Sequence, residues 1–327
     1  MEFQIEIAIE SFIISVIAAL IIIPILKKLK IGQIERTDGP QSHLKKQGTP
    51  TMGGVIMIVT LIIATIILAV FYKWFNKWPT MAGRFIPLVL LAIGFGLIGF
   101  IDDAKKMIFK NTEGLKPSYK MIGLLIISVL YTIYLVYILK IGTETYIPFL
   151  KQFVELPVWI YIPFAIFVLL GTTNAVNLTD GVDGLATTVT TIIITALSVI
   201  GVVTGVEEIS VLGSILIGAC LGFLIFNLYP AKVIMGDTGS LLLGGVICGM
   251  ALYLKMPLIL VIIALIPIIE TVSVMMQVVY YKKTGKRIFK MAPIHHHFEL
   301  SGWNENKVVS VFGIITFILS IIAIKAI

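Results

Sequence analysis

The 327-residue sequence has little charge and very little cysteine for its length. Asp, Glu, Lys and Arg make up 13% of the residues, whereas ordinary globular chains contain about 25%. Hydrophobic residues make up 58%, which excludes a soluble α/β enzyme and a disordered chain. The two cysteines, Cys220 and Cys248, lie inside apolar runs. We therefore expect packing residues rather than a disulfide or a metal-binding pair.

Long apolar runs, bounded by charged residues or by Pro and Gly, recur along the whole sequence. A helical membrane span needs about 20 apolar residues. The expected fold class is all-α, a polytopic integral membrane protein with a single transmembrane domain over residues 1–327. The runs predict ten spans, near 11–29, 52–71, 84–101, 119–139, 158–175, 186–204, 210–228, 240–254, 257–281 and 308–325.

Lysine and arginine are distributed unequally between alternate loops. If the loop after the first span is inside, the inner side holds 18 of these residues and the outer side holds seven. The positive-inside rule then predicts that both termini are outside. A hairpin is predicted on the outer side, between Thr143 and Glu155. The predicted cytoplasmic loops lie near 30–51, 102–118, 176–185, 229–239 and 282–307.

The inner ends of the spans hold most of the reactive polar residues. All five aspartates after position 100 lie there, together with three of the four histidines. Such groups near a bilayer are costly, and they mark candidate functional sites. The alternative, a set of solvated helix ends, would have to hold for four loops at once.

The acidic pair Asp102-Asp103 ends the third predicted span. Neighbours on a helix point about 100° apart, so the two carboxylates are not expected to bind one ion side by side. One would face the reacting groups, and the other would hold a metal or a lysine. Lys106 is four residues after Asp102 and is expected to reach the same site as a phosphate partner.

An amide and carboxylate series follows the fifth predicted span. Asn174, Asn177, Asp180 and Asp183 recur every three residues, which brings them to one side of a turn or helix start. The segment contains no Lys or Arg. It therefore predicts either a polar pocket for a neutral group, such as a nucleoside, or a set of metal ligands.

Asp237 lies between two glycines, just before the eighth predicted span. A glycine-rich segment that opens a helix can offer backbone N–H groups to a phosphate, and a lone Asp there could hold Mg²⁺ against it. The alternative is a helix cap with an acidic first turn.

His295, His296 and His297 are consecutive, whereas helical metal ligands usually stand three or four residues apart. We expect them to bind an anion or to hydrogen-bond a substrate rather than zinc. Glu270 lies inside the ninth predicted span. We favour a structural hydrogen bond to a neighbouring helix over catalysis for this residue.

Five ordered segments together resemble the phospho-N-acetylmuramoyl-pentapeptide translocase family of bacterial membrane enzymes. This family belongs to the polyprenyl-phosphate N-acetylhexosamine-1-phosphate transferases. The segments are QSHLKKQGTPTMGG at 41–54, IDDAKK at 101–106, NAVNLTDGVDGLA at 174–186, FNLYPAKVIMGDTGS at 226–240 and PIHHHFELSGW at 293–303. The resemblance implies ten spans around a cytoplasm-facing cleft in the bacterial inner membrane, a homodimer, and Mg²⁺ as cofactor.

The activity that the resemblance implies is transfer of phospho-MurNAc-pentapeptide from UDP-MurNAc-pentapeptide to undecaprenyl phosphate. The products would be lipid I, a precursor of peptidoglycan, and UMP. By motif, it implies catalytic roles for Asp102, Asp103, Asp237 and His295, with Mg²⁺ on Asp237. It implies substrate binding by Lys106, Asn174, Asn177, Asp180, Asp183, Asn227, His296 and His297.

Two alternatives stay open from the sequence. A related transferase could use UDP-GlcNAc, although the PIHHHFE segment argues against it. An ion-coupled transporter would commonly place its acids at the midplane of broken helices in paired repeats, whereas these acids lie at span ends without an evident repeat. A nucleic-acid partner is not expected. Attack by an Asp or directly by the lipid phosphate also stays open, and we favour direct attack because that phosphate is already an anion.

Overall fold

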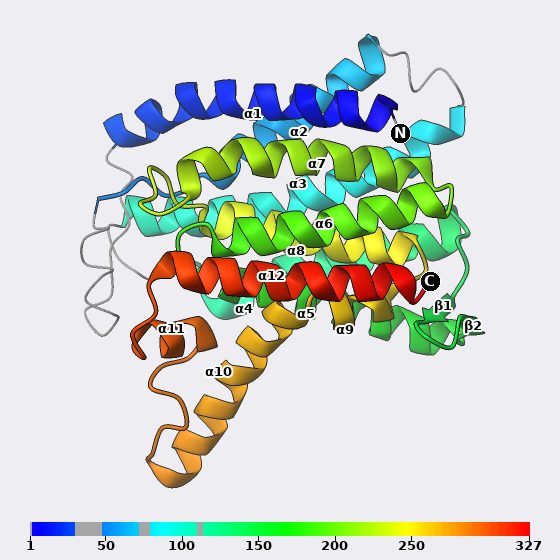
Figure 1. Ribbon diagram of the computed structural model, residues 1–327. Helices are drawn as coiled ribbons and strands as arrows, with labels where there is room; N and C mark the ends of the chain where they lie inside the picture. The colour runs from blue at the N-terminus through cyan, green and yellow to red at the C-terminus, as the bar shows by residue number, and fades with distance from the viewer. Residues whose placement is uncertain (1, 30–47, 72–78, 110–113) are drawn as a thin grey trace.

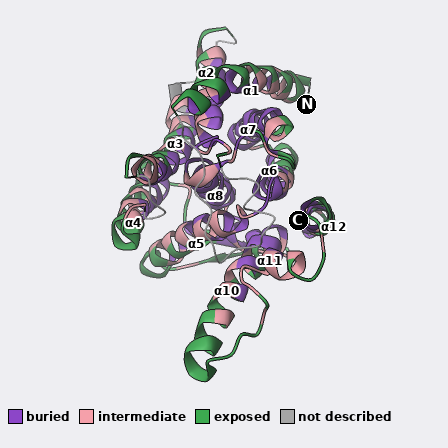
Figure 2. Ribbon diagram, turned by 90° about the vertical axis from the view of Figure 1, so that its left-hand side faces the viewer, coloured by how far each residue is buried: buried purple, intermediate pink, exposed green. Residues whose placement is uncertain are grey.

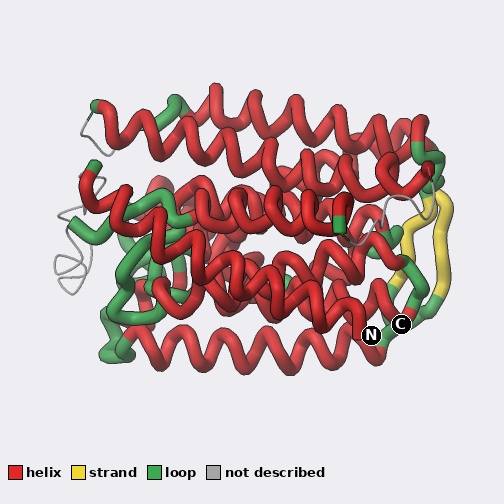
Figure 3. The backbone as a smooth tube through the Cα atoms, turned by 90° about the horizontal axis from the view of Figure 1, so that it is seen from above, coloured by secondary structure: helices red, strands yellow, loops and turns green. Residues whose placement is uncertain are grey.

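The computed structural model describes residues 2–29, 48–71, 79–109 and 114–327. Figure 1 shows a bundle of long helices, with both chain ends at one end of the bundle. Figure 3 shows the two short strands at this same end. The helices are α1 (Glu2–Lys28), α2 (Gly54–Val70), α3 (Pro79–Ile108), α4 (Pro117–Ile133), α5 (Val158–Thr179), α6 (Leu185–Val203), α7 (Glu207–Asn227), α8 (Gly236–Tyr253), α9 (Leu260–Ile263), α10 (Leu265–Thr284), α11 (Ile294–Glu299) and α12 (Glu305–Lys325).

Helix α8 lies at the centre of the bundle (Figure 2) and packs against α2, α3, α5 and α6. Of the 18 residues of α8, 89% are buried, whereas only 28% are buried in an apolar stretch of 18 residues in α5. Small residues permit this close packing. A Cβ added to Gly54 of α2 would overlap the backbone of Gly239, and one added to Gly99 of α3 would overlap the backbone carbonyl of Asp237. Both neighbouring helices therefore approach the start of α8 backbone to backbone.

Eight of the described helices are long and apolar enough to cross a membrane, and a bent pair would make a ninth. Helix α2, with 17 residues, is shorter than these. The predicted polytopic helical architecture is thus confirmed. Ten spans, and the outward position of both termini, stay predictions.

The prediction of one continuous helix for the ninth span, near 257–281, is wrong. The chain forms a 3₁₀ turn at Pro257–Ile259, then α9, and then α10 after a bend of 81°. Pro267 has no N–H to donate to the carbonyl of Ile263, and Ala264 between the two helices leaves the helical region with ψ at 24°. Helix α10 consequently leaves the bundle (Figure 1).

Several helices extend beyond the predicted span ends. Helix α1 begins at Glu2 instead of near residue 11, α8 begins at Gly236, and α3 continues to Ile108, so the acidic pair lies within a helix rather than in a loop. Charged residues do not break a helix, whereas the predicted span edges were placed where charged residues, Pro or Gly end an apolar run. The predicted loop 30–51 lies largely outside the described residues.

The hairpin predicted between Thr143 and Glu155 is present, and its position on the outer side stays a prediction. Strand β1 (Glu144–Ile147) pairs antiparallel with β2 (Gln152–Glu155), after α4 ends in a π-helical turn at Tyr134–Ile138. The hydroxyl of Tyr146 donates to the backbone carbonyl of Ala326 over 3.1 Å, so the hairpin is held against the end of α12.

Candidate active site

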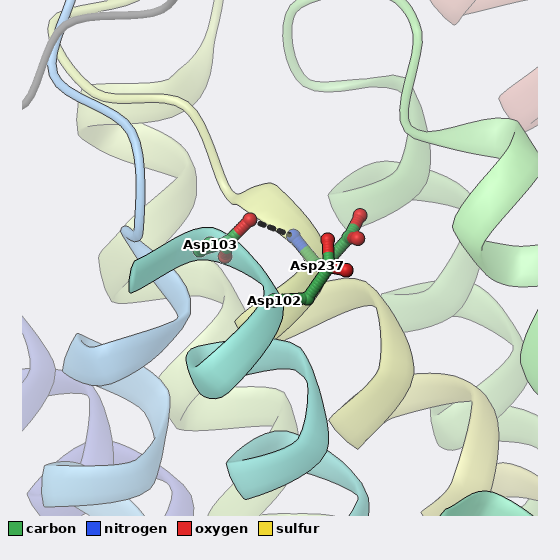
Figure 4. A group of neighbouring side chains, drawn as sticks. All are labelled: Asp102, Asp103 and Asp237. Carbon is green, nitrogen blue, oxygen red and sulfur yellow. Dashed lines mark hydrogen bonds between the residues drawn. The ribbon is translucent and has the colours of Figure 1, made fainter. Parts of the chain in front are cut away.

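Four helix ends meet at the end of the bundle opposite the chain termini. Helices α3 and α5 contribute their C-terminal turns, and α4 and α8 contribute their first turns. Figure 4 shows Asp102 and Asp103 on α3 facing Asp237 in the first turn of α8. The sequence predicted that these three side chains share a site, and the structure brings them together.

Asp103 caps helix α8 from the neighbouring helix. Its Oδ1 accepts from the backbone N–H of Asp237 over 3.2 Å. Its Oδ2 accepts from the backbone N–H and the hydroxyl of Thr238, over 2.9 and 2.7 Å. The first N–H groups of a helix lack internal partners, and the positive end of its dipole favours a carboxylate. Asp103 therefore fixes the start of α8 against α3.

Gly236, immediately before Asp237, is suited to this junction for two reasons. Its φ is 72°, in the left-handed region that glycine adopts without steric cost. A Cβ at this position would also come within 2.7 Å of Asp103 Oδ2. Any other residue would press the cap away from the helix.

Asp102 diverges from Asp103, as the helical spacing predicted. Its Oδ2 lies 2.6 Å from the ammonium group of Lys106, one turn later on α3. Its Oδ1 accepts from the backbone N–H of Leu115 over 2.7 Å. Asp102 thus has the lysine expected for one member of the pair. Asp103 is engaged mainly by the backbone of α8, and Lys106 Nζ lies 3.8 Å from its Oδ1.

Asp237 is bonded to donors from three other helices. Its Oδ2 lies 3.0 Å from Lys106 Nζ and 2.9 Å from Lys120 Nζ. Its Oδ1 accepts from the amide of Asn177, on α5, over 2.8 Å. The same amide donates to the Ser240 hydroxyl over 2.8 Å. One largely buried carboxylate therefore links the ends of α3, α4 and α5 to the start of α8.

Lys120 is the member of this cluster that sequence reasoning missed. It entered only the count of inner-loop charges, and the choice between a pocket for a neutral group and a set of metal ligands used the absence of Lys and Arg from residues 174–184. The structure adds a cation from another helix, since Lys120 of α4 lies 3.4 Å from Asn177 Oδ1. One signal was present: a lysine in the first turn of a helix opposes the helix dipole, so it needs an acidic partner elsewhere.

Asp102, Asp103 and Asp237 could together hold a metal ion. One carboxylate oxygen from each lies within 4.8 Å of the others, and no other group of this kind occurs among the residues that the structure describes. A donor set of oxygens alone suits Mg²⁺. The two lysine ammonium groups also suit the oxygens of a phosphate.

Only some of the Asn and Asp residues between 174 and 183 lie at the cluster of Asp102, Asp103 and Asp237. Asn174 donates to the carbonyl of Leu170 on its own helix over 2.8 Å, and no contact joins it to the acidic cluster within the described ranges. Asp180, at the C-terminal end of α5, accepts from the backbone of Gly236. Burial, together with the negative charges of Asp237 and Asp103, raises the pKa of Asp180 from its usual 3.8 to about 8.

Asp183 and Asn227 are buried and bonded to the loop that precedes α8. Asp183 Oδ2 accepts from the backbone N–H of Ala231 over 2.9 Å. The Asn227 amide donates to the carbonyl of Val233 over 3.0 Å, and its oxygen accepts from the Thr187 hydroxyl over 2.6 Å. Both side chains therefore shape the backbone beside the cluster.

The three histidines have three different partners. His295 is fully buried, with Nδ1 3.0 Å from Glu270 Oε2. His296 Nδ1 lies 2.7 Å from Glu299 Oε2, and His297 Nδ1 accepts from the backbone N–H of Lys290 over 3.1 Å. The structural contact expected for Glu270 is present, and its partner is a histidine of α11.

Comparison with known proteins agrees with this geometry. Residues 85–255 match the family model described as Glycosyl transferase family 4. Relatives named phospho-N-acetylmuramoyl-pentapeptide-transferase occur in Clostridium perfringens strain 13, with 51% identity over 96% of this chain and 95% of the relative, and in Clostridium novyi strain NT, with 49% identity over 95% and 93%. A third, from Acetivibrio thermocellus, is 46% identical over 97% of this chain and 93% of its own.

The chain belongs to the phospho-N-acetylmuramoyl-pentapeptide-transferase family. The family and the transferase activity predicted from the sequence are therefore confirmed. The transporter alternative has no support from these relatives. Asp102, Asp103, Lys106, Lys120, Asn177 and Asp237 all lie within the matched residues 85–255.

Proposed function

We propose that this transferase moves phospho-MurNAc-pentapeptide from UDP-MurNAc-pentapeptide to undecaprenyl phosphate, yielding lipid I and UMP. The observation that supports it best is the cluster at the start of α8, where Asp237 contacts Lys106, Lys120 and Asn177 beside Asp102. The name shared by the relatives supports the identity of the transferred group. The proposal includes a homodimer in the bacterial inner membrane, with ten spans around a cleft and the active site facing the cytoplasm. The unequal distribution of Lys and Arg supports this orientation.

In the proposed reaction, an oxygen of the lipid phosphate attacks the phosphorus attached to the sugar. The bond from that phosphorus to the bridging oxygen breaks, and UMP leaves with the bridging oxygen and its electron pair. Both reactants are anions, so positioning and charge neutralisation are the main requirements. Lys106 and Lys120 lie 3.0 and 2.9 Å from the same oxygen of Asp237. They can turn towards phosphate oxygens without leaving the site.

Asp102, Asp103 and Asp237 form an all-oxygen donor set that fits Mg²⁺. Asp103 holds the backbone of α8 with both oxygens, whereas the partners of Asp237 are side chains that can turn away. We therefore assign the metal chiefly to Asp237, with help from Asp102. The bound ion would neutralise charge on the pyrophosphate and on the leaving UMP.

Asp102 is assigned a supporting role rather than that of a covalent nucleophile. Its Oδ1 is engaged by the Leu115 backbone and its Oδ2 by Lys106. The lipid phosphate is already an anion at neutral pH and needs little further activation. Asp102 would hold the Lys106 ammonium group in place and could accept a remaining phosphate proton on Oδ2.

The remaining predicted binding residues are assigned to the UDP-linked donor. Asn174, Asn177 and Asp180 lie at the end of α5, where they can bind the nucleoside. Asp183 and Asn227 shape the neighbouring backbone through the bonds described above. We assign His295, His296 and His297 to the sugar-peptide side of the donor.

The deciding experiment uses purified protein in detergent with undecaprenyl phosphate and Mg²⁺. UMP release is measured with UDP-MurNAc-pentapeptide and, separately, with UDP-GlcNAc. We expect release only with the first donor. Release with UDP-GlcNAc alone would assign the chain to the simpler sugar-phosphate transfer, and release with neither would contradict the proposed function.

A further inference from the structure

Glu270 and His295 form a buried pair in which the proposed chemistry gives Glu270 no role. Both side chains have 0% exposure. Besides the 3.0 Å approach of Nδ1, the backbone N–H of His295 donates to Glu270 Oε2 over 3.4 Å. Burying a carboxylate and an imidazole is costly unless they satisfy one another. The pair therefore fixes the start of α11 against α10.

The chain after α10 is folded back so that this pair can form. Gln277 donates to the carbonyl of Phe289 over 3.1 Å and accepts from the N–H groups of Ile288 and Phe289, each over 3.0 Å. Glu270 and Gln277 are seven residues apart, which places them two turns apart on the same face of α10. The segment after α10 therefore contacts this face at two places, at Gln277 through Ile288 and Phe289 and at Glu270 through His295.

The opposite edge of the His295 ring faces the turn that follows α5. A Cβ added to Gly181 would overlap His295 Nε2, and it would come within 2.8 Å of Cε1. Neither ring nitrogen has a hydrogen-bonding partner among the described residues, and Nδ1 makes only its 3.0 Å approach to Glu270 Oε2. The ring therefore fills the space between Glu270 and Gly181, and only glycine leaves room for it there.

The turn that Gly181 belongs to follows Asp180 and leads to Asp183. It is held from other sides as well: the backbone N–H of Asp183 donates to Glu305 Oε2 over 3.2 Å, and Asp183 accepts from Ala231. The His295 ring lies between this turn and Glu270 of α10. A change in the ring's orientation would move the turn, and with it Asp180 beside Gly236 and Asp237.

We infer that Glu270 is a positioning residue for the transfer reaction: it holds His295 against Gly181, and His295 in turn sets the place of Asp180 beside Asp237. A carboxylate on one ring nitrogen fixes the orientation and tautomer of an imidazole. Where such a partner supports a metal-bound histidine, its loss typically costs about 10–100-fold in affinity or activity. This inference rests on the proposed function for its assay.

The first test is a double-mutant cycle of Glu270→Gln and His295→Ala. Glu270→Gln keeps the shape of the side chain and removes its charge. We expect it to lower kcat/KM for the UDP-linked donor about 10-fold, with little change in the apparent KM for the lipid phosphate. In the His295→Ala background, Glu270→Gln should change kcat/KM less than about twofold, because residues that act through one another are not additive. Glu270→Asp, which keeps the charge, should retain more activity than Glu270→Gln.

The second test acts from the other side of the ring. Gly181→Ala should displace His295 and lower the same kcat/KM about 10-fold. Gly171→Ala in α5 is the matched control, since an added Cβ there has no neighbour within 4 Å, and we expect unchanged activity.

Losses in Glu270→Gln and His295→Ala that multiply in the double variant would overturn the inference, as would wild-type kinetics for Glu270→Gln. If Glu270→Gln does not fold, judged by gel filtration and thermal melting in detergent, a cycle of Gly181→Ala with His295→Ala decides the question by the same criterion. A wild-type protein that releases no UMP contradicts the proposed function instead. In that case binding of UDP to the same variants tests the positioning role.

Discussion

Replacing Lys120 tests whether the α4 lysine belongs to the catalytic cluster. Its side chain is 16% exposed, with Nζ 2.9 Å from Asp237 Oδ2. At that distance, two unit charges attract by roughly 6 kcal/mol at an effective dielectric constant of about 20, before desolvation is subtracted. Lys106 stays beside the same oxygen and would compensate in part. We expect Lys120→Met to cost about 10²–10³-fold in kcat, roughly 3–4 kcal/mol of transition-state stabilisation.

Lys116 is the matched control for this substitution. It lies four residues earlier, at the N-cap of α4, and is exposed. Lys116→Met removes the same charge from the same surface, so it reports the effect of the general electrostatic field. We expect it to change kcat less than about twofold, because exposed charges contribute little.

The assay is UMP release at saturating UDP-linked donor and lipid phosphate, over a range of Mg²⁺ concentrations. Lys120→Arg should recover part of the rate, because it restores the charge with a different hydrogen-bonding geometry. Equal losses in Lys120→Met and Lys116→Met would refute the assignment. So would a loss in Lys120→Met that higher donor concentration fully restores, because that would limit Lys120 to ground-state binding.

Four further outcomes are expected. Asp237→Asn should abolish turnover in protein that still elutes as a folded species in detergent, and an unaltered rate with unaltered Mg²⁺ dependence would remove this residue from the site. His295→Ala should lower kcat/KM for the UDP-linked donor at least about 10²-fold, roughly 2.7 kcal/mol, and a selective loss of lipid affinity would show that the loop has another task. Burial raises the pKa of Asp180 from 3.8 to about 8, so the folded state binds the proton more tightly and wild-type stability falls as pH rises through that window. Without Mg²⁺, the melting-temperature advantage of Asp180→Asn should therefore grow between about pH 4 and 8 and then level off, and a pH-independent difference would contradict the shift. Single cysteines in the loop 285–293 should react with an impermeant thiol reagent only in inverted vesicles, and labelling in intact cells would reverse the proposed orientation.

The membrane class, the hairpin and the grouping of the acids could be predicted from the sequence. Each depends on a local pattern, such as an apolar run or polar residues at a span end. The break at Ala264 was also within reach, since Pro267 cannot complete the hydrogen bond to Ile263, but continuous hydrophobicity concealed it. Apolar runs alone do not distinguish a straight helix from a bent one.

The roles of Asp103 and Lys120 could not be derived in the same way. Asp103 caps a helix that begins more than 130 residues later, and the close packing of α3 on α8 depends on Gly99. Lys120 reaches Asp237 because α4 begins beside the end of α5. Both contacts are tertiary, and no spacing along the chain encodes them.

The charge balance of the cluster leads to a coupling between metal and donor. The carboxylates of Asp102, Asp103 and Asp237 face two ammonium groups, from Lys106 and Lys120, so the formal sum is one negative charge. A pyrophosphate would enter against that charge, whereas one divalent ion would make the site positive. The N-terminal end of α8 adds to the attraction for an anion. Donor and Mg²⁺ should therefore bind with positive cooperativity, each raising the affinity of the other by the same factor.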